Sequence, residues 1–335
     1  MRPIAILLLV VWHSFIIYAG GWRKPVGFQS VECYWWLAKL SYAFMLELFV
    51  FVSGYVFGLA LEYKHLSFKT LLINKFKRLI IPSLIFGTIY YLIFYNLDNF
   101  TVVGFVWKVL NGCAHMWFLP MLFWVTLMAF GLDKLRLPQW FKLVGVCCFP
   151  ALAVLPLPLG LSEAMYYIPI FYIGILIYKS RKLIVGYLCK HLIRGLLLGL
   201  VFILLFVVLI VVNRDILSVS LESNSLIARG LGAIGRRYMQ LICAASGVAF
   251  AFFVVNYVME TKNITIPKWI IELNGVCFGI YLFQQFILQI LYYKTALPTL
   301  VGPYWLPWVG LIVTLVCSYL LTKLSLKTKI GRQLM

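Results

Sequence analysis

Ten apolar runs, separated by short charged or proline-rich stretches, dominate this chain of 335 residues and restrict what it can fold into. They cover approximately residues 3–18, 35–61, 79–97, 115–132, 143–157, 164–178, 192–212, 238–259, 274–292 and 303–321. A helix that crosses a bilayer uses roughly 20 apolar residues. Because 64% of the residues are hydrophobic and only 12% are charged, the chain lacks the polar surface of a soluble or a disordered protein. We predict an all-α polytopic membrane bundle of about ten transmembrane helices, with no soluble domain.

The distribution of positive charge predicts the orientation of these helices. The segments outside the apolar runs can be numbered from the N-terminus. The odd-numbered segments, with the run edges beside them, contain 20 of the 29 Lys and Arg residues, and the even-numbered segments contain eight. Lys and Arg are enriched in cytoplasmic loops, so we expect both termini in the cytoplasm. This bias accounts for the net charge of +19 without a nucleic-acid partner. The run at 143–157 is interrupted by prolines, and a re-entrant segment there would reverse the orientation of everything after it.

The first apolar run is short for a membrane crossing and begins directly after Arg2. Its composition also resembles a secretory signal peptide, although Trp12 and His13 interrupt the apolar stretch. We expect a truncated N-terminus, with a natural cytoplasmic extension preceding this start.

The eight cysteines show no spacing typical of a zinc site, so we expect no metal. Most of them lie inside apolar runs, where a reduced, packed thiol is the usual role. Cys33 and Cys113 fall in segments that we place on the same outer side, which leaves a disulfide between them open.

Arg2 and His13 are the clearest candidates for catalysis, because ionisable side chains at membrane depth are costly and often functional. Eleven residues of α-helix turn through about 1100° and rise about 16 Å, so both side chains project from one face. An imidazole there can accept a proton from a hydroxyl, and a cation below it can hold an anionic or carbonyl group. The plainer alternative is that Arg2 is a positive-inside anchor and that His13 makes an interhelical hydrogen bond.

A basic cluster lies at the expected inner end of the third run and contains Lys75, Lys77 and Arg78. Such clusters usually meet anionic lipid headgroups. They also suit the phosphates of a nucleotide-bearing donor, which we expect these three residues to bind.

Other polar or interfacial side chains inside the runs are candidates for lining a cavity. They are Glu47, Ser53, His115, Trp117, Tyr281 and Gln284. For Ser53 and its neighbour Gly54 the alternative is close helix packing, and for Gln284 it is an interhelical hydrogen bond.

These pieces together resemble the acyltransferase-3 family of integral membrane acyltransferases. Ten residues separate Arg2 from His13, as in the family's signature, and a Phe-rich stretch ends in Ser53, Gly54 and Tyr55. The basic loop at 75–82, the Trp-Phe-Leu element at 117–119 and the Tyr-Leu element at 281–282 follow in the family's order. Three departures are the missing residues before Arg2, Lys75 where the family often has Arg, and Gln284 where it often has His.

The resemblance implies one acyltransferase-3-like domain over residues 1–335, in a bacterial inner membrane. It implies transfer of an acyl group, usually acetyl from cytoplasmic acetyl-CoA, to a hydroxyl of a cell-surface or exported glycan, with His13 as general base. The partners would be acyl-CoA, a glycan or lipid-linked saccharide and membrane lipid, with no permanently bound cofactor. An acyl-histidine intermediate stays open.

A transporter or flippase for a lipid-linked glycan or small anion is the main alternative function. It would use the same buried charges as a pathway rather than as catalysts. The four arginines expected outside at 214, 229, 236 and 237 suggest that the acceptor is acidic.

Overall fold

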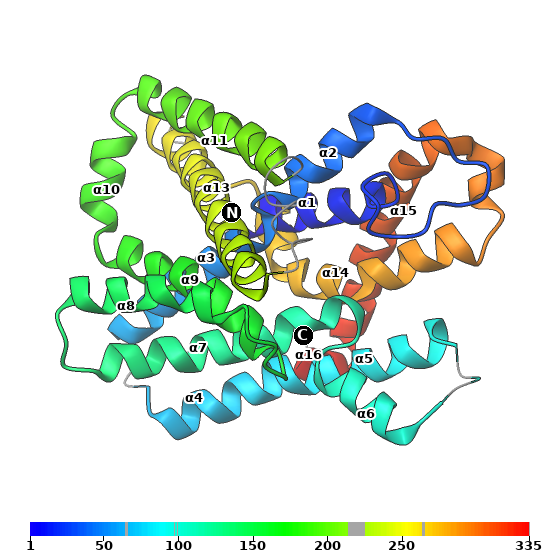
Figure 1. Ribbon diagram of the computed structural model, residues 1–335, viewed down its shortest axis with the longest axis horizontal. Helices are drawn as coiled ribbons and strands as arrows, with labels where there is room; N and C mark the ends of the chain where they lie inside the picture. Colours follow the sequence, from blue (N-terminus) through cyan, green and yellow to red (C-terminus); the bar gives the residue numbers. More distant parts are fainter. Residues whose placement is uncertain (64–65, 97, 99, 214–224, 263–264, 335) are drawn as a thin grey trace. The chain divides into compact units, whose positions relative to one another are not determined.

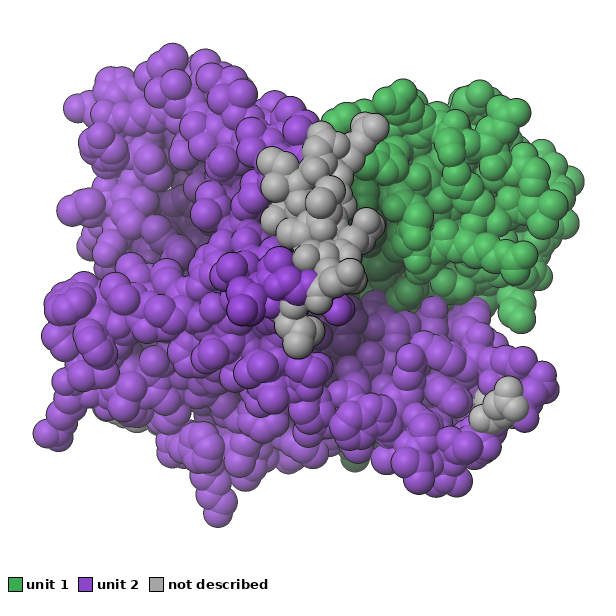
Figure 2. Space-filling view, viewed as in Figure 1, with its two compact units in different colours: residues 1–46, 265–335 green, residues 47–264 purple. Residues whose placement is uncertain are grey.

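The computed structural model describes residues 1–63, 66–96, 98, 100–213, 225–262 and 265–334. Its described residues form helices and connecting turns without a strand (Figure 1). They divide into two compact units, each considered by itself (Figure 2). Unit 1 contains Met1–Leu46 and Thr265–Met335, and unit 2 contains Glu47–Ile264.

Unit 1 is built from helices at both ends of the chain. They are α1 (Arg2–Phe15), α2 (Glu32–Tyr42), α14 (Lys268–Tyr293), α15 (Leu297–Lys327) and α16 (Lys329–Leu334). Unit 2 consists of the middle of the chain. Its first helix, α3, begins at Met45, two residues before the boundary of the unit at Glu47. Its helices are α3 (Met45–Tyr63), α4 (Phe68–Lys75), the π-helix η1 (Phe76–Ile80), α5 (Ile81–Phe94), α6 (Val102–Leu110), the 3₁₀-helix η2 (Ala114–Trp117), α7 (Phe118–Lys134), α8 (Gln139–Leu152), α9 (Leu161–Lys179), α10 (Arg181–Leu188), α11 (Leu192–Val212) and α13 (Leu226–Lys262).

The structure confirms the all-α polytopic bundle. Eight helical segments among the described residues are long and apolar enough to cross a membrane. The other two expected spans are α1 and α8, apolar helices of 14 residues each. The second expected span differs from a single helix, because a turn at residues 43–44 separates α2 from α3. The eighth is longer than expected, since α13 has 37 residues and begins at Leu226.

Close packing of small residues holds α14 against α15 in unit 1. A Cβ on Gly279 would lie 2.3 Å from the side chain of Thr322, and one on Gly310 would lie 2.5 Å from the hydroxyl of Tyr292. Helix α15 carries a small buried residue at every fourth position of this stretch, namely Gly310, Thr314, Ser318 and Thr322. Helices in membranes associate through such stripes because small side chains let the backbones approach.

Close packing at glycines also joins α3 to α9 in unit 2. A Cβ on Gly54 would lie 2.0 Å from the carbonyl oxygen of Phe171, and one on Gly174 would lie 2.4 Å from the carbonyl oxygen of Phe51. Each helix therefore places a glycine against the backbone of the other. Packing is confirmed as the role of Gly54.

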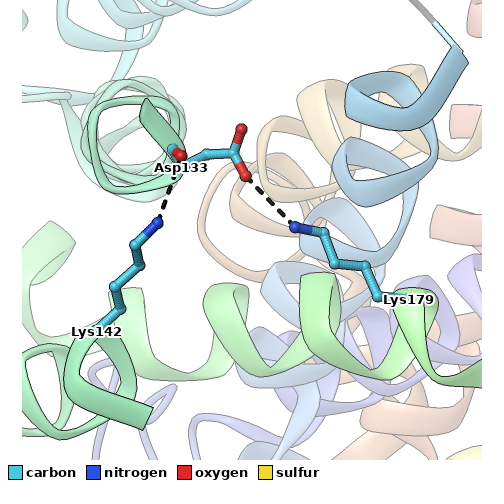
Figure 3. Close-up of polar contacts among 3 residues, drawn as sticks. All are labelled: Asp133, Lys142 and Lys179. Atoms are coloured by element: carbon cyan, nitrogen blue, oxygen red, sulfur yellow. Dashed lines mark hydrogen bonds and ion pairs between the residues drawn. The ribbon is translucent and has the colours of Figure 1, made fainter. Parts of the chain in front are cut away.

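Polar contacts show that α8 runs between opposite ends of unit 2. At one end, the carboxylate of Asp133 pairs with Lys179 at 3.4 Å, and its carbonyl accepts a hydrogen bond from Lys142 at 3.4 Å (Figure 3). These contacts unite the end of α7, the start of α8 and the end of α9. At the other end, the Leu159 N–H donates to the side-chain oxygen of Asn111 at 2.7 Å. Helix α8 and the loop that follows it thus connect the two ends.

Candidate functional site

Helices α1 and α14 run side by side in the same direction within unit 1. At one end, Arg2 and the N-terminal ammonium lie close enough to the Cys277 thiol to interact with it electrostatically. At the other end, the Tyr292 hydroxyl donates to the carbonyl of Ser14 at 2.7 Å. Arg2 and Ser14 are about 18 Å apart along α1 at 1.5 Å per residue. The two helices therefore stay together over the whole stretch that separates Arg2 from His13.

A buried stripe on α14 lies along this stretch. It consists of Cys277, Tyr281, Gln284, Leu288 and Tyr292, which repeat every three to four residues and therefore share one face of the helix. The stripe begins beside Arg2 and ends at Ser14. Tyr281 and Gln284 consequently lie at levels between Arg2 and His13, so that unit 1 brings together four of the predicted site residues.

Gln284 is fully buried, with no exposed surface. Neither its amide oxygen nor its amide nitrogen has a hydrogen-bond partner among the described residues. An unsatisfied buried amide costs roughly 1–3 kcal/mol, so its retention needs an explanation. A polar ligand that hydrogen-bonds both amide atoms would supply one. The amide can both donate and accept hydrogen bonds.

His13 lies beside an aromatic cluster near the end of α1. The imidazole is 8% exposed and stacks on the indole of Trp22, with ring centroids 5.8 Å apart. The Trp22 ring in turn meets the edges of Tyr292 and Tyr293 at 6.5 and 6.4 Å. The loop that carries Trp22 is fixed to α14, because the Tyr293 hydroxyl donates to the carbonyl of Arg23 at 2.6 Å.

Trp22 is not among the residues predicted from the sequence. The signal available for it was an aromatic residue a few positions after the candidate histidine, in the segment that leaves the same helix. Interfacial tryptophans are common, so this signal alone would not have separated Trp22 from its neighbours.

The carboxyl group of Glu47 lies inside unit 2 and is 6% exposed. It accepts a hydrogen bond from the hydroxyl of Tyr166 at 3.3 Å. The guanidinium of Arg237 lies 6.0 Å from the centroid of the same tyrosine ring. A buried carboxyl group needs such polar neighbours. Residues 229, 236 and 237 belong to α13 rather than to a loop, and residue 214 lies outside the described residues.

Aromatic contacts connect Glu47 to Trp117. Tyr166 meets Tyr167 edge-on at 4.7 Å, and the Tyr167 ring stacks on the Trp117 indole at 6.3 Å. Two predicted site residues from different helices therefore belong to one cluster in unit 2. Ser53 makes a different contact, because its hydroxyl donates to the carbonyl of Phe49 at 2.8 Å, within its own helix.

A tight turn before α7 positions His115 and Trp117. Gly112 has a φ of +81°, and a Cβ there would lie 2.5 Å from the backbone nitrogen of Trp117. Ala114 also has a positive φ, 51°, which is uncommon for a residue with a side chain. The turn places the His115 ring 6.0 Å from Tyr90, edge to face, where it is 6% exposed. Strained backbone of this kind is often found where a side chain must be held in place.

The basic cluster of Lys75, Lys77 and Arg78 lies on the π-helix η1 and the residue before it. Lys77 and Arg78 are exposed, and Lys75 is partly exposed. A π-helical turn is rare and frequently marks a functional site. These side chains, with Glu47, Ser53, His115 and Trp117, belong to unit 2, whereas Arg2, His13, Tyr281 and Gln284 belong to unit 1.

The cysteines and acidic residues form no obvious metal centre among the described residues, in which no group of three His, Cys, Asp or Glu could hold an ion. Cys33 is an exposed free thiol of unit 1, and Cys113 is a buried free thiol of unit 2.

Comparison with known proteins adds evidence that is independent of this geometry. No curated protein and no solved structure matches the chain. The model of the acyltransferase-3 family, described as an acyltransferase domain, matches residues 1–323. This match covers both units and all the predicted site residues. With helices long and apolar enough to cross a membrane, the chain is a membrane acyltransferase that belongs to the acyltransferase-3 family.

Proposed function

We propose that this protein is an O-acyltransferase that moves an acetyl group from cytoplasmic acetyl-CoA to a hydroxyl group of a cell-surface or exported glycan. It would act in a bacterial inner membrane with both termini in the cytoplasm. The observation that carries the proposal is the α1–α14 stretch, which has Arg2 at one end, His13 near the other, and the orphaned amide of Gln284 between them.

The proposed chemistry assigns the proton transfer to His13. The imidazole accepts the proton of the acceptor hydroxyl while the hydroxyl oxygen attacks the thioester carbonyl carbon. The carbon–sulfur bond then breaks, the CoA thiolate leaves with the proton from His13, and the acetyl ester remains on the glycan. General-base catalysis of this kind typically contributes 10²–10⁴-fold to the rate.

Arg2, Tyr281 and Gln284 would stabilise the reacting groups. The phenol and the amide nitrogen can donate a hydrogen bond to the carbonyl oxygen as negative charge develops on it, while the guanidinium, about 16 Å from His13 along α1, would help to hold the donor. In unit 2, Lys75, Lys77 and Arg78 would bind the donor's phosphates. Their position on a widened turn with two of the cations exposed supports this role.

The remaining candidates of unit 2 would contact the acceptor. Glu47 accepts hydrogen bonds, and Trp117 offers an aromatic ring of the kind that packs on sugars. Their membership of one cluster supports this assignment. His115 belongs to the same turn as Trp117, while the Ser53 hydroxyl, which is engaged by its own helix, would have a packing role.

The test is transfer of radiolabel from acetyl-CoA to membrane glycan fractions by the purified protein in detergent or in nanodiscs. The His13→Asn variant is expected to lose 10²–10⁴-fold in rate, since the amide cannot accept the proton at neutral pH. His191→Asn is the matched control, because His191 is exposed and precedes α11 in unit 2.

Retention of the wild-type rate by a folded His13→Asn protein would refute the role of the imidazole. Movement of a lipid-linked glycan or anion across vesicles without any acetyl transfer would refute the enzymatic proposal as a whole. Size-exclusion profiles of both variants establish that they are folded.

A further inference from the structure

A cavity of about 590 Å³ lies against α10 in unit 2, and no predicted site residue contributes to it. Its lining comes from α3, from α10 and the two residues after it, and from α13. The polar lining residues are Tyr55, Arg181, Lys182, Lys190, Asn256 and Glu260. Three of these side chains are cations and one is an anion, so the cavity is net positive.

The arginines near α10 are already committed to structural contacts. Arg181 donates to the carbonyl of Tyr178 at 3.0 Å, stacks on the Tyr178 ring at 4.1 Å, and pairs with Glu62 at 3.5 Å. Beyond the other end of α10, the guanidinium of Arg194 lies over the Tyr187 ring at 3.9 Å. These contacts fix both ends of the short helix.

The two lysines of the cavity have no comparable role. Lys182 and Lys190 are exposed, and neither forms an ion pair with any residue that the structure describes. Lys182 on α10 and Lys190, two residues past the end of α10, therefore present two ammonium groups to one hollow, in which Glu260 is the one acidic lining residue. Such groups suit a phosphate ester as point charges that approach it from two sides.

The surroundings of the cavity are apolar on the outside of α10. Leu183 is 76% exposed and Tyr187 is 63% exposed. Helix α10 joins two helices that are apolar enough to cross a membrane, α9 and α11. A short helix with exposed apolar side chains and cations, placed between two such helices, is expected at the surface of the bilayer.

We propose that this cavity binds a phosphate ester, with Lys182 and Lys190 as its charged contacts. Two sources share this chemistry, namely the headgroup of an anionic phospholipid and the nucleotide end of the acyl donor. The second source rests on the proposed function, whereas the first is independent of it.

The test compares Lys182→Gln/Lys190→Gln with a matched control, Lys327→Gln/Lys329→Gln. The control removes two exposed lysines of unit 1 and lowers the net charge equally. One arm measures phosphatidylglycerol retained by the full chain, by native mass spectrometry, against phosphatidylcholine. The other arm measures binding of adenosine 3′,5′-bisphosphate by calorimetry at low salt. Both arms measure binding rather than turnover, and the phospholipid arm does not depend on the transferase proposal.

The wild-type protein and the control are expected to bind in at least one arm, and the lysine variant to bind there about tenfold more weakly. The affected arm identifies the source of the phosphate. The affinity should fall as salt rises, because the two lysines are exposed. Equal affinity of all three proteins in both arms, or no binding by the wild-type protein in either arm, would overturn the proposal.

Discussion

Replacement of Gly54 by alanine is expected to destabilise unit 2, and the structure sets the size of the effect. The added Cβ would lie 2.0 Å from the carbonyl oxygen of Phe171 and 2.8 Å from the carbonyl carbon. Because these atoms belong to the backbone of α9, no rotamer change can relieve the overlap. The two helices would have to separate by about 1 Å, which also opens the reciprocal contact of Gly174 with Phe51.

Overpacking of this kind costs about 1–3 kcal/mol. The gain in helix propensity from glycine to alanine returns up to about 1 kcal/mol. We expect a net loss of about 1–2 kcal/mol, because the backbone cannot yield as a side chain does. For a unit of this size such a loss lowers the melting temperature by about 2–8 °C.

Gly145→Ala is the matched control, since nothing lies within 4 Å of a Cβ at that position in α8. It is expected to melt at the wild-type temperature or slightly above it. Fluorescence-detected size-exclusion chromatography after heating in detergent measures all three proteins. Equal melting temperatures for Gly54→Ala and Gly145→Ala would show that the close approach of α3 and α9 does not hold unit 2 together.

Three further outcomes follow from individual contacts. Tyr166→Phe removes the hydrogen bond to Glu47 and should cost about 1 kcal/mol, and a double-mutant cycle with Glu47→Gln should show that the two losses are not additive. Asp133→Asn should lower the free energy of unfolding by less than 1 kcal/mol, because the ion pair with Lys179 is partly exposed and the backbone carbonyl still accepts a hydrogen bond from Lys142. Melting of the wild-type and Asp133→Asn proteins at low and high salt measures this loss. Burial raises the pKa of the Cys189 thiol, so the thiol stays protonated at pH 7. Alkylation of Cys189 by N-ethylmaleimide, mapped by mass spectrometry, should therefore be slow at pH 7 and accelerate as the pH rises. An alkylation rate that does not depend on pH would contradict this.

The helical class and the places of the membrane helices could be predicted because they depend on local composition. An apolar run must satisfy its backbone hydrogen bonds internally in lipid, so a helix follows from the run itself. The pairing of Arg2 with His13 on one helix face also needs only the helical repeat. The lengths were less predictable, since α13 extends twelve residues before the apolar run, through a stretch that contains three arginines and three glycines.

The partners of the site residues could not be predicted, because they come from distant parts of the chain. Tyr166 contacts Glu47 across 119 positions, and Tyr292 contacts Ser14 across 278. Tyrosines are common in this sequence, with 20 in all, and nothing local distinguishes these two. The break at residues 43–44 is equally hidden, because neither residue is a glycine or a proline and the hydropathy runs on through it.

The π-helix at the basic cluster illustrates a boundary between what a sequence predicts and what packing decides. Pro82 has no N–H, and its ring conflicts with the carbonyl four residues earlier, that of Arg78. The sequence therefore predicts a disturbance in the preceding turn. The structure shows its form, since the Ile81 N–H bonds to the carbonyl of Phe76, five residues back. Because this widened turn precedes a run that is apolar from Leu79 onward, the cations stay on the last turn before the expected membrane crossing, where a phosphate can reach them without entering the hydrocarbon.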